Sequence, residues 1–224
     1  MSGSKHTDPP GIRATRRVAR PDEQRGATDP SRDRNVARLL KELGVDGGDA
    51  AAKAAREART AVNVTRPRPG FHHPASAADI RSVLEFFGPI VRYGIRSIEL
   101  RQRGDSVATI KIAELRNPGV VRLFEQPLGI WRIPGQLTPS TASQLLEAGA
   151  RFDETPITTL VEWPDPVDLR DFVLFDGLLH EIGHHLIQHH TGKRSARVMR
   201  TRDHELQAAV FAKSCRQTWR DATA

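Results

Sequence analysis

The chain has 224 residues and a single cysteine, Cys215, which excludes an internal disulfide and a cysteine-based zinc knuckle. Its formal charge is +7 at pH 7, and most of the excess lies in residues 1–70, where 15 Lys and Arg face 9 Asp and Glu. No run of about 18 apolar residues is present, and the N-terminus lacks the apolar core of a secretory signal. We therefore expect a cytoplasmic protein that does not associate with membranes.

Residues 1–70 are predicted to be a basic, largely disordered region with short helices at most. Residues 1–33 are rich in Pro, Gly, Arg and Asp without periodicity. Two later segments have helical features, namely Asn35–Leu43 and the Ala-rich Ala50–Ala61, and a Pro-rich linker ends at Gly70. Such a tail is usually solvated, but its charge keeps nucleic acid, or another acidic partner, as an alternative role.

Residues 71–224 are predicted to be one folded domain. Ser76 and Asp79 resemble a capping box, and the apolar spacing that follows predicts a helix ending at Gly88. Alternating or β-branched runs predict strands, and Pro139 begins a short helix that ends at Gly149. This order, with antiparallel strands separate from the helices, indicates an α+β fold. The strands are expected over 95–100, 107–115, 120–124, 129–133 and 157–163.

Two helices are predicted at the C-terminal end. Asp168 is expected to cap the first, which carries a broad apolar face and ends at Gly192. The second is expected to begin at Thr201 and to run to about Trp219. The predicted apolar face consists of Phe172, Phe175, Leu178, Leu179, Ile182 and Leu186.

The first of these helices carries an HExxH pattern, His180-Glu181-Ile182-Gly183-His184. Residues four apart on a helix lie about 40° apart around its axis, so both imidazoles can reach one ion. Glu181 points about 100° away, where its carboxylate can address a metal-bound water as general base. The alternative is a helix with surface histidines, but its apolar flanks make unpaired imidazoles costly there.

A catalytic zinc needs a third protein ligand. Glu205 begins the last helix, and the small residues Ala208, Ala209 and Ala212 after it allow close packing against the motif helix. We expect Glu205 to complete a Zn²⁺ site with His180 and His184. His204 is the competing third ligand, and a solvated Glu205 is the alternative to both.

HEIGHH followed by Glu205-x-x-Ala208-x-x-Phe211-Ala212 resembles the gluzincin zinc metallopeptidases, in particular compact families of the ImmA/IrrE-like and HtpX-like kinds. The resemblance covers about residues 178–212. It implies a zincin-like minimal domain, in which an antiparallel sheet precedes the HExxH helix and a C-terminal helix carries the Glu ligand. It also implies that His180, His184 and Glu205 bind zinc, that Glu181 is the general base, and that an edge strand aligns the substrate backbone.

The sequence departs from that family at Ala209, where many relatives have Asp or Asn. Asp176 and Asp203 are candidate acceptors for imidazole N–H groups, although each is more often solvated. His185 is expected at the surface or at the rim of the site.

The sequence thus predicts a zinc metalloendopeptidase acting on a protein or peptide substrate. The alternative is a metal-binding regulatory domain without general proteolysis, recruited to nucleic acid or a partner by residues 1–70.

Overall fold

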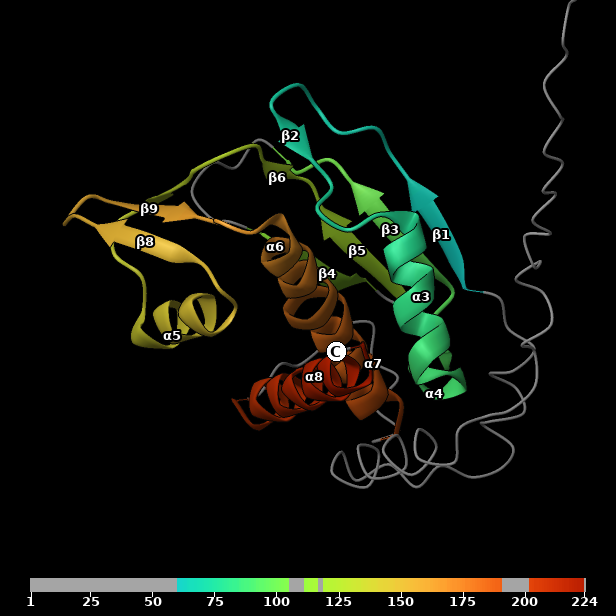
Figure 1. Ribbon diagram of the computed structural model, residues 1–224. Coiled ribbons are helices and arrows are strands. Elements are labelled where there is room, and N and C mark those ends of the chain that lie inside the picture. Colours follow the sequence, from blue (N-terminus) through green and yellow to red (C-terminus); the bar gives the residue numbers. More distant parts are fainter. Residues whose placement is uncertain (1–59, 105–110, 117–118, 191–201, 224) are drawn as a thin grey trace, which may run out of the picture.

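The computed structural model describes residues 60–104, 111–116, 119–190 and 202–223 (Figure 1). The expected helix over Asn35–Leu43 and nearly all of the one over Ala50–Ala61 lie outside these residues. Within them the fold is α+β, and a mixed sheet, a smaller antiparallel sheet and a two-stranded ribbon accompany the helices. No helix of the described part is long and apolar enough to cross a membrane.

The main sheet has four strands in the order β1-β3-β5-β4. They are β1 (Ala61–Val64), β3 (Ser97–Arg101), β4 (Ala113–Arg116) and β5 (Val120–Phe124). β1, β3 and β5 are parallel, and β4 pairs antiparallel with β5 at one edge. The expectation of an antiparallel sheet is therefore wrong for this sheet. The chain passes from β1 to β3 through a helical crossover, which makes these two strands parallel, and from β3 to β5 through the antiparallel strand β4.

β1 also shows that the sheet begins before residue 71, where the folded domain was expected to start. Ala61 and Val64 pair with Ser97 and Leu100. A strand of four residues, three of them exposed, has too little apolar alternation to be recognised inside a basic segment.

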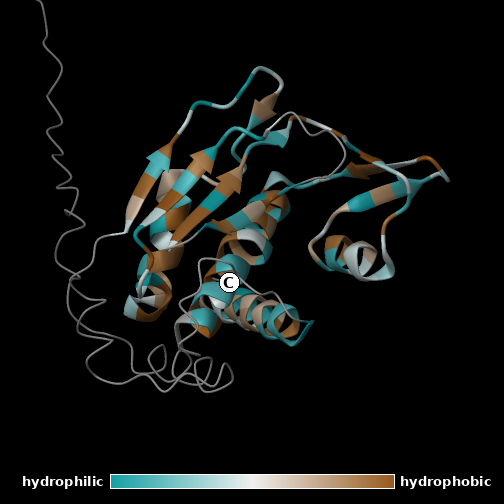
Figure 2. Cartoon of the chain, turned by 180° about the vertical axis from the view of Figure 1, so that it is seen from behind, coloured by the Kyte–Doolittle hydropathy of each residue, from teal (hydrophilic) through white to brown (hydrophobic). Residues whose placement is uncertain are grey.

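The crossover is formed by α3 (Ala77–Phe87) and α4 (Pro89–Arg92), which lie beside the sheet in Figure 1. The expected capping box of α3 is confirmed: the Ser76 hydroxyl accepts from the Asp79 N–H at 3.1 Å, and the Asp79 carboxylate accepts from the Ser76 N–H at 2.8 Å. Gly88 caps the other end, as predicted. The buried side of α3 packs against the apolar face of the sheet, and Figure 2 shows hydrophobic and hydrophilic segments alternating along its strands.

A second part of the fold lies beside the first. The ribbon pairs β2 (Phe71–His72) with β6 (Gln126–Pro127), and the smaller sheet has the order β7-β9-β8. Its strands, all antiparallel, are β7 (Trp131–Pro134), β8 (Arg151–Glu154) and β9 (Thr158–Glu162). The helix α5 (Pro139–Glu147) follows β7 and precedes β8 in the chain. β7, β9 and α5 were predicted, whereas β8, with the sequence RFDE, was not.

One continuous helical segment carries the HExxH motif: α6 (Pro166–Phe172), the π-helix η2 (Val173–Leu179) and α7 (His180–His190). Its N-cap is Asp165, whose carboxylate accepts from the Val167 N–H at 2.8 Å, and not Asp168 as predicted. Pro166 occupies the first helical position, where its missing N–H costs nothing, so the helix begins three residues earlier. All six residues of the predicted apolar face are buried.

The last helix, α8 (Arg202–Thr223), packs along α7 and η2, as the red and brown helices of Figure 1 show. Its buried residues are Ala208, Phe211, Ala212 and Cys215. Farther along, Trp219 packs edge-on against Phe86 of α3, with ring centroids 4.9 Å apart. α8 therefore connects the motif helix with the crossover that covers the sheet.

Candidate metal centre

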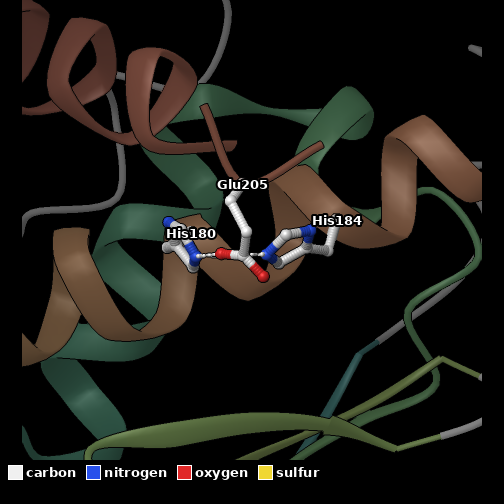
Figure 3. A group of neighbouring side chains, drawn as sticks. All are labelled: His180, His184 and Glu205. Atoms are coloured by element: carbon white, nitrogen blue, oxygen red, sulfur yellow. Dashed lines mark hydrogen bonds and ion pairs between the residues drawn. The ribbon is translucent and has the colours of Figure 1, made fainter. Parts of the chain in front are cut away.

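Three side chains from two helices meet at one point. His180 and His184 lie on α7 and Glu205 lies on the first turn of α8, and Figure 3 shows the carboxylate between the two imidazole rings. One potential ligand atom from each residue lies within 4.8 Å of the others. Among the described residues this group is close enough to hold a metal ion.

The distances within the group are those of a small coordination sphere. The two imidazole Nε2 atoms are 3.1 Å apart, and Oε2 of Glu205 lies 3.4 Å from Nε2 of His180 and 3.3 Å from Nε2 of His184. Tetrahedral zinc with bonds of about 2.0–2.1 Å separates its ligand atoms by roughly 3.3–3.4 Å. The triangle therefore fits one face of such a tetrahedron, and the donors fit zinc chemically because they are two imidazoles and a carboxylate.

The burial of the three side chains is graded. His184 is 1% exposed, His180 is 18% exposed and Glu205 is 43% exposed. His184 is thus enclosed by the fold, whereas Glu205 is the most exposed member of the group. His204, the competing ligand, is not a member of this group.

Glu205 reaches the imidazoles because α8 packs very closely on α7 at Gly183. A Cβ at Gly183 would meet Cα of Ala208 at 3.2 Å, Cβ of Ala208 at 3.4 Å and Cδ1 of Phe211 at 3.1 Å. The contacts with Cα of Ala208 and with Phe211 are tighter than ordinary van der Waals contact. The position between the two histidines is thus where the helix axes approach each other, three residues along α8 from Glu205.

Glu181 is not a member of the triad, and its carboxylate contacts the main sheet at β4. It is 4% exposed, and its Oε2 accepts a hydrogen bond of 2.9 Å from the backbone N–H of Leu115 in the edge strand β4. Sequence reasoning missed Leu115 because a backbone amide carries no signal in residue type. The strand prediction over 107–115 placed it in a strand but could not show which edge it faces.

Two expectations about the surroundings are corrected. His185 is not at the surface: it is 7% exposed, and its Nε2 lies 3.0 Å from the carbonyl oxygen of Tyr93 at the end of α4. This contact ties α7 to the crossover.

Asp176 is neither solvated nor bonded to a ligand imidazole, because it forms an ion pair with Arg216 of α8 and accepts from Nε2 of Gln144 at 3.2 Å. Burial lowers the pKa of Arg216 to about 10, which leaves it protonated at neutral pH. The ion pair fixes the position of α8 along η2, three helical turns from Glu205. Asp203, the other candidate acceptor, is exposed.

No family model matches the chain, and the searches of curated proteins and of solved structures also give no match.

Proposed function

We propose that the chain is a zinc-dependent hydrolase of peptide bonds, in which His180, His184 and Glu205 hold the metal and Glu181 is the general base. The observation that carries the proposal is the triangle of ligand atoms, with sides of 3.1, 3.3 and 3.4 Å. The HExxH spacing brings only the two imidazoles together. The third ligand comes from a separate helix, so its placement is support independent of the motif.

The proposal includes a zincin-like arrangement and a protein or peptide substrate. The order of elements is compatible with it, since the main sheet precedes α7 in the chain and the Glu-bearing α8 follows. The antiparallel edge strand β4 lies against the motif helix, on the side of Glu181.

The chain's own residues divide the chemistry between them. Bound zinc would polarise a substrate carbonyl and lower the pKa of a coordinated water to about 7. Glu181 would serve as the general base, taking a proton from the attacking water and passing it to the leaving amine. The Leu115 N–H holds the Glu181 carboxylate in one place, and the burial of Glu181 excludes bulk water from that side of the helix.

The test combines metal analysis with cleavage of a mixed peptide library and of unfolded proteins. Wild type is expected to bind about one zinc per chain and to cleave. Glu181→Gln should keep the zinc but lose at least about a hundredfold in turnover, the lower end of what a general base contributes. Glu205→Ala should lose both zinc and cleavage.

The matched control is Asp203→Asn, two residues from Glu205 on the same helical turn, in an exposed carboxylate outside the triad. It should leave zinc binding and cleavage intact. Zinc binding by wild type without cleavage of any substrate would favour the metal-binding regulatory domain, and cleavage by Glu181→Gln at the wild-type rate would contradict the role given to Glu181.

A further inference from the structure

The motif-bearing helix has a second glycine at a close contact, on another side. Gly177 lies in η2, and a Cβ there would meet Cγ2 of Ile112 at 3.0 Å, Cβ of Ala113 at 3.6 Å and Cδ2 of Leu123 at 3.8 Å. Ile112 directly precedes the edge strand β4, Ala113 is the first residue of β4, and Leu123 is in β5. Gly177 is thus a point where the motif helix lies close against the main sheet.

The backbone conformation does not require glycine at this position, because Gly177 is not among the glycines with positive φ. Glycine inside a helix costs roughly 0.5–1 kcal/mol relative to alanine. The feature of the structure that accounts for glycine here is the room it leaves for Ile112 and Ala113.

The register of β4 explains why its distance from the helix matters. The N–H of Phe124 donates to the carbonyl of Ile112 at 2.9 Å, so Ile112 forms a hydrogen-bonded pair with β5. In an antiparallel pair the hydrogen-bonded residues alternate with residues whose N–H and C=O point the other way. Leu115 is of this second kind, and its N–H points outward to Glu181.

Gly177 lies against side chains on the face of the sheet at β4 and β5, and Glu181 accepts from a backbone N–H of the same edge strand, β4. They are four residues apart in the chain, Gly177 in η2 and Glu181 at the start of α7, and their partners in β4, Ala113 and Leu115, are two residues apart. A shift of the strand at the first contact should change the hydrogen-bond distance at the second, because the two contacted residues are only two positions apart in β4.

We infer that Gly177 is a positioning residue for Glu181: it admits β4 close enough for the Leu115 N–H to hold the carboxylate. The catalytic significance of this contact rests on the proposed function, whereas the contact itself can be tested without metal or substrate. Gly177 and Gly183 then have separate tasks. Gly183 admits α8 and with it Glu205, and Gly177 admits β4 and with it the donor to Glu181.

The test measures hydrogen exchange of the Leu115 amide in the metal-free protein, together with zinc content and turnover. Glu181→Ala removes the acceptor and gives the reference exchange rate of the Leu115 amide without this hydrogen bond. Gly177→Val should raise the exchange rate of Leu115 by about five- to tenfold, as expected for losing one hydrogen bond. Gly177→Ala should have a smaller effect, and adding Ile112→Ala should reverse it, since this removes the atom 3.0 Å away.

Zinc and turnover provide the second readout. Gly177→Val should lower kcat while its zinc content stays at the wild-type level, a result that general destabilisation does not produce. Gly183→Ala, the same type of change on another side of the helix, should leave Leu115 exchange at the wild-type rate. If Gly177→Val fails to fold, Gly177→Ala with and without Ile112→Ala decides the question.

Wild-type exchange of Leu115 in both Gly177 variants, or no increase in Glu181→Ala, would overturn the inference. If wild type binds no zinc or cleaves nothing, the proposed function fails instead, and the exchange rates still show whether Gly177 sets the contact.

Discussion

Replacing Gly183 with alanine should weaken zinc binding without unfolding the protein. The new Cβ would lie 3.2 Å from Cα of Ala208 and 3.1 Å from Cδ1 of Phe211, below the 3.4 Å at which ordinary contact begins. The ring of Phe211 can turn, but a backbone atom moves only with its helix. α8 must therefore retreat by a few tenths of an ångström, three residues from Glu205.

Metal ligands tolerate displacements of about 0.2 Å from their preferred distances. A shift of this size should lower zinc affinity by about 10- to 100-fold, the range for changes in groups that orient ligands. The apo protein should lose little stability, because alanine improves local helix propensity by about 0.5–1 kcal/mol and offsets part of the strain.

The assay is competition for zinc against a fluorescent chelator, with thermal unfolding of the apo protein measured in parallel. Gly104→Ala is the matched control, since a Cβ there meets nothing within 4 Å. Wild-type zinc affinity in Gly183→Ala would refute the reasoning, because it would mean that α8 absorbs the methyl group without moving Glu205.

Three further predictions concern other parts of the chain. Removing zinc with a chelator should lower the midpoint of thermal unfolding, since a ligand at 100 times its Kd stabilises the folded state by about 2.7 kcal/mol; an unchanged midpoint would contradict a metal centre. Burial alone would raise the pKa of Glu125, but hydrogen bonds from Arg68 and from the Arg103 N–H lower the pKa below its usual value. The ionised Glu125 therefore contributes fully to stability above about pH 4.3. This contribution is lost as the pH falls through the lowered pKa. Glu125→Gln should therefore cost about 1–3 kcal/mol at neutral pH and flatten the acid limb of stability against pH, measured by urea unfolding. If residues 1–70 bind nucleic acid, deleting residues 1–59 should abolish salt-dependent binding to a DNA duplex, whereas unchanged binding would exclude the tail as the contact.

Local signals were sufficient for much of the fold. The strand over Val120–Phe124, the helix from Pro139 and the capping box of α3 were predicted because apolar alternation, a proline at a helix start and a Ser-x-x-Asp cap act within a few residues. β1 and β8 were not predicted, since both are four-residue strands with mostly exposed side chains. β1 pairs with residues 36 positions later in the chain, and β8 pairs with residues 5 to 11 positions later.

The candidate site was likewise predicted only in part. The i, i+4 spacing of His180 and His184 follows from helix geometry, and the small residues of α8 indicated a close neighbour for Glu205. The contact of Glu181 with Leu115 could not be predicted, because it depends on which edge of the sheet β4 occupies. The π-helix η2 was not predicted either, and it changes the helix register before His180. Asp176, one turn before His180, was expected near that histidine but pairs with Arg216 of α8.

The candidate metal-binding triad and the proposed base therefore depend on different contacts of one helix. α8 brings Glu205 to the histidines at Gly183, and its alignment is fixed farther along by the ion pair between Asp176 and Arg216. β4 reaches Glu181 from the sheet and does not contribute to the triad. The two supports come from different partners of the helix, α8 and β4, so a substitution at one should chiefly affect the property that it supports. Zinc affinity and turnover should then be separable by substitution in this protein, which would not be possible if one contact positioned both the ligand and the base.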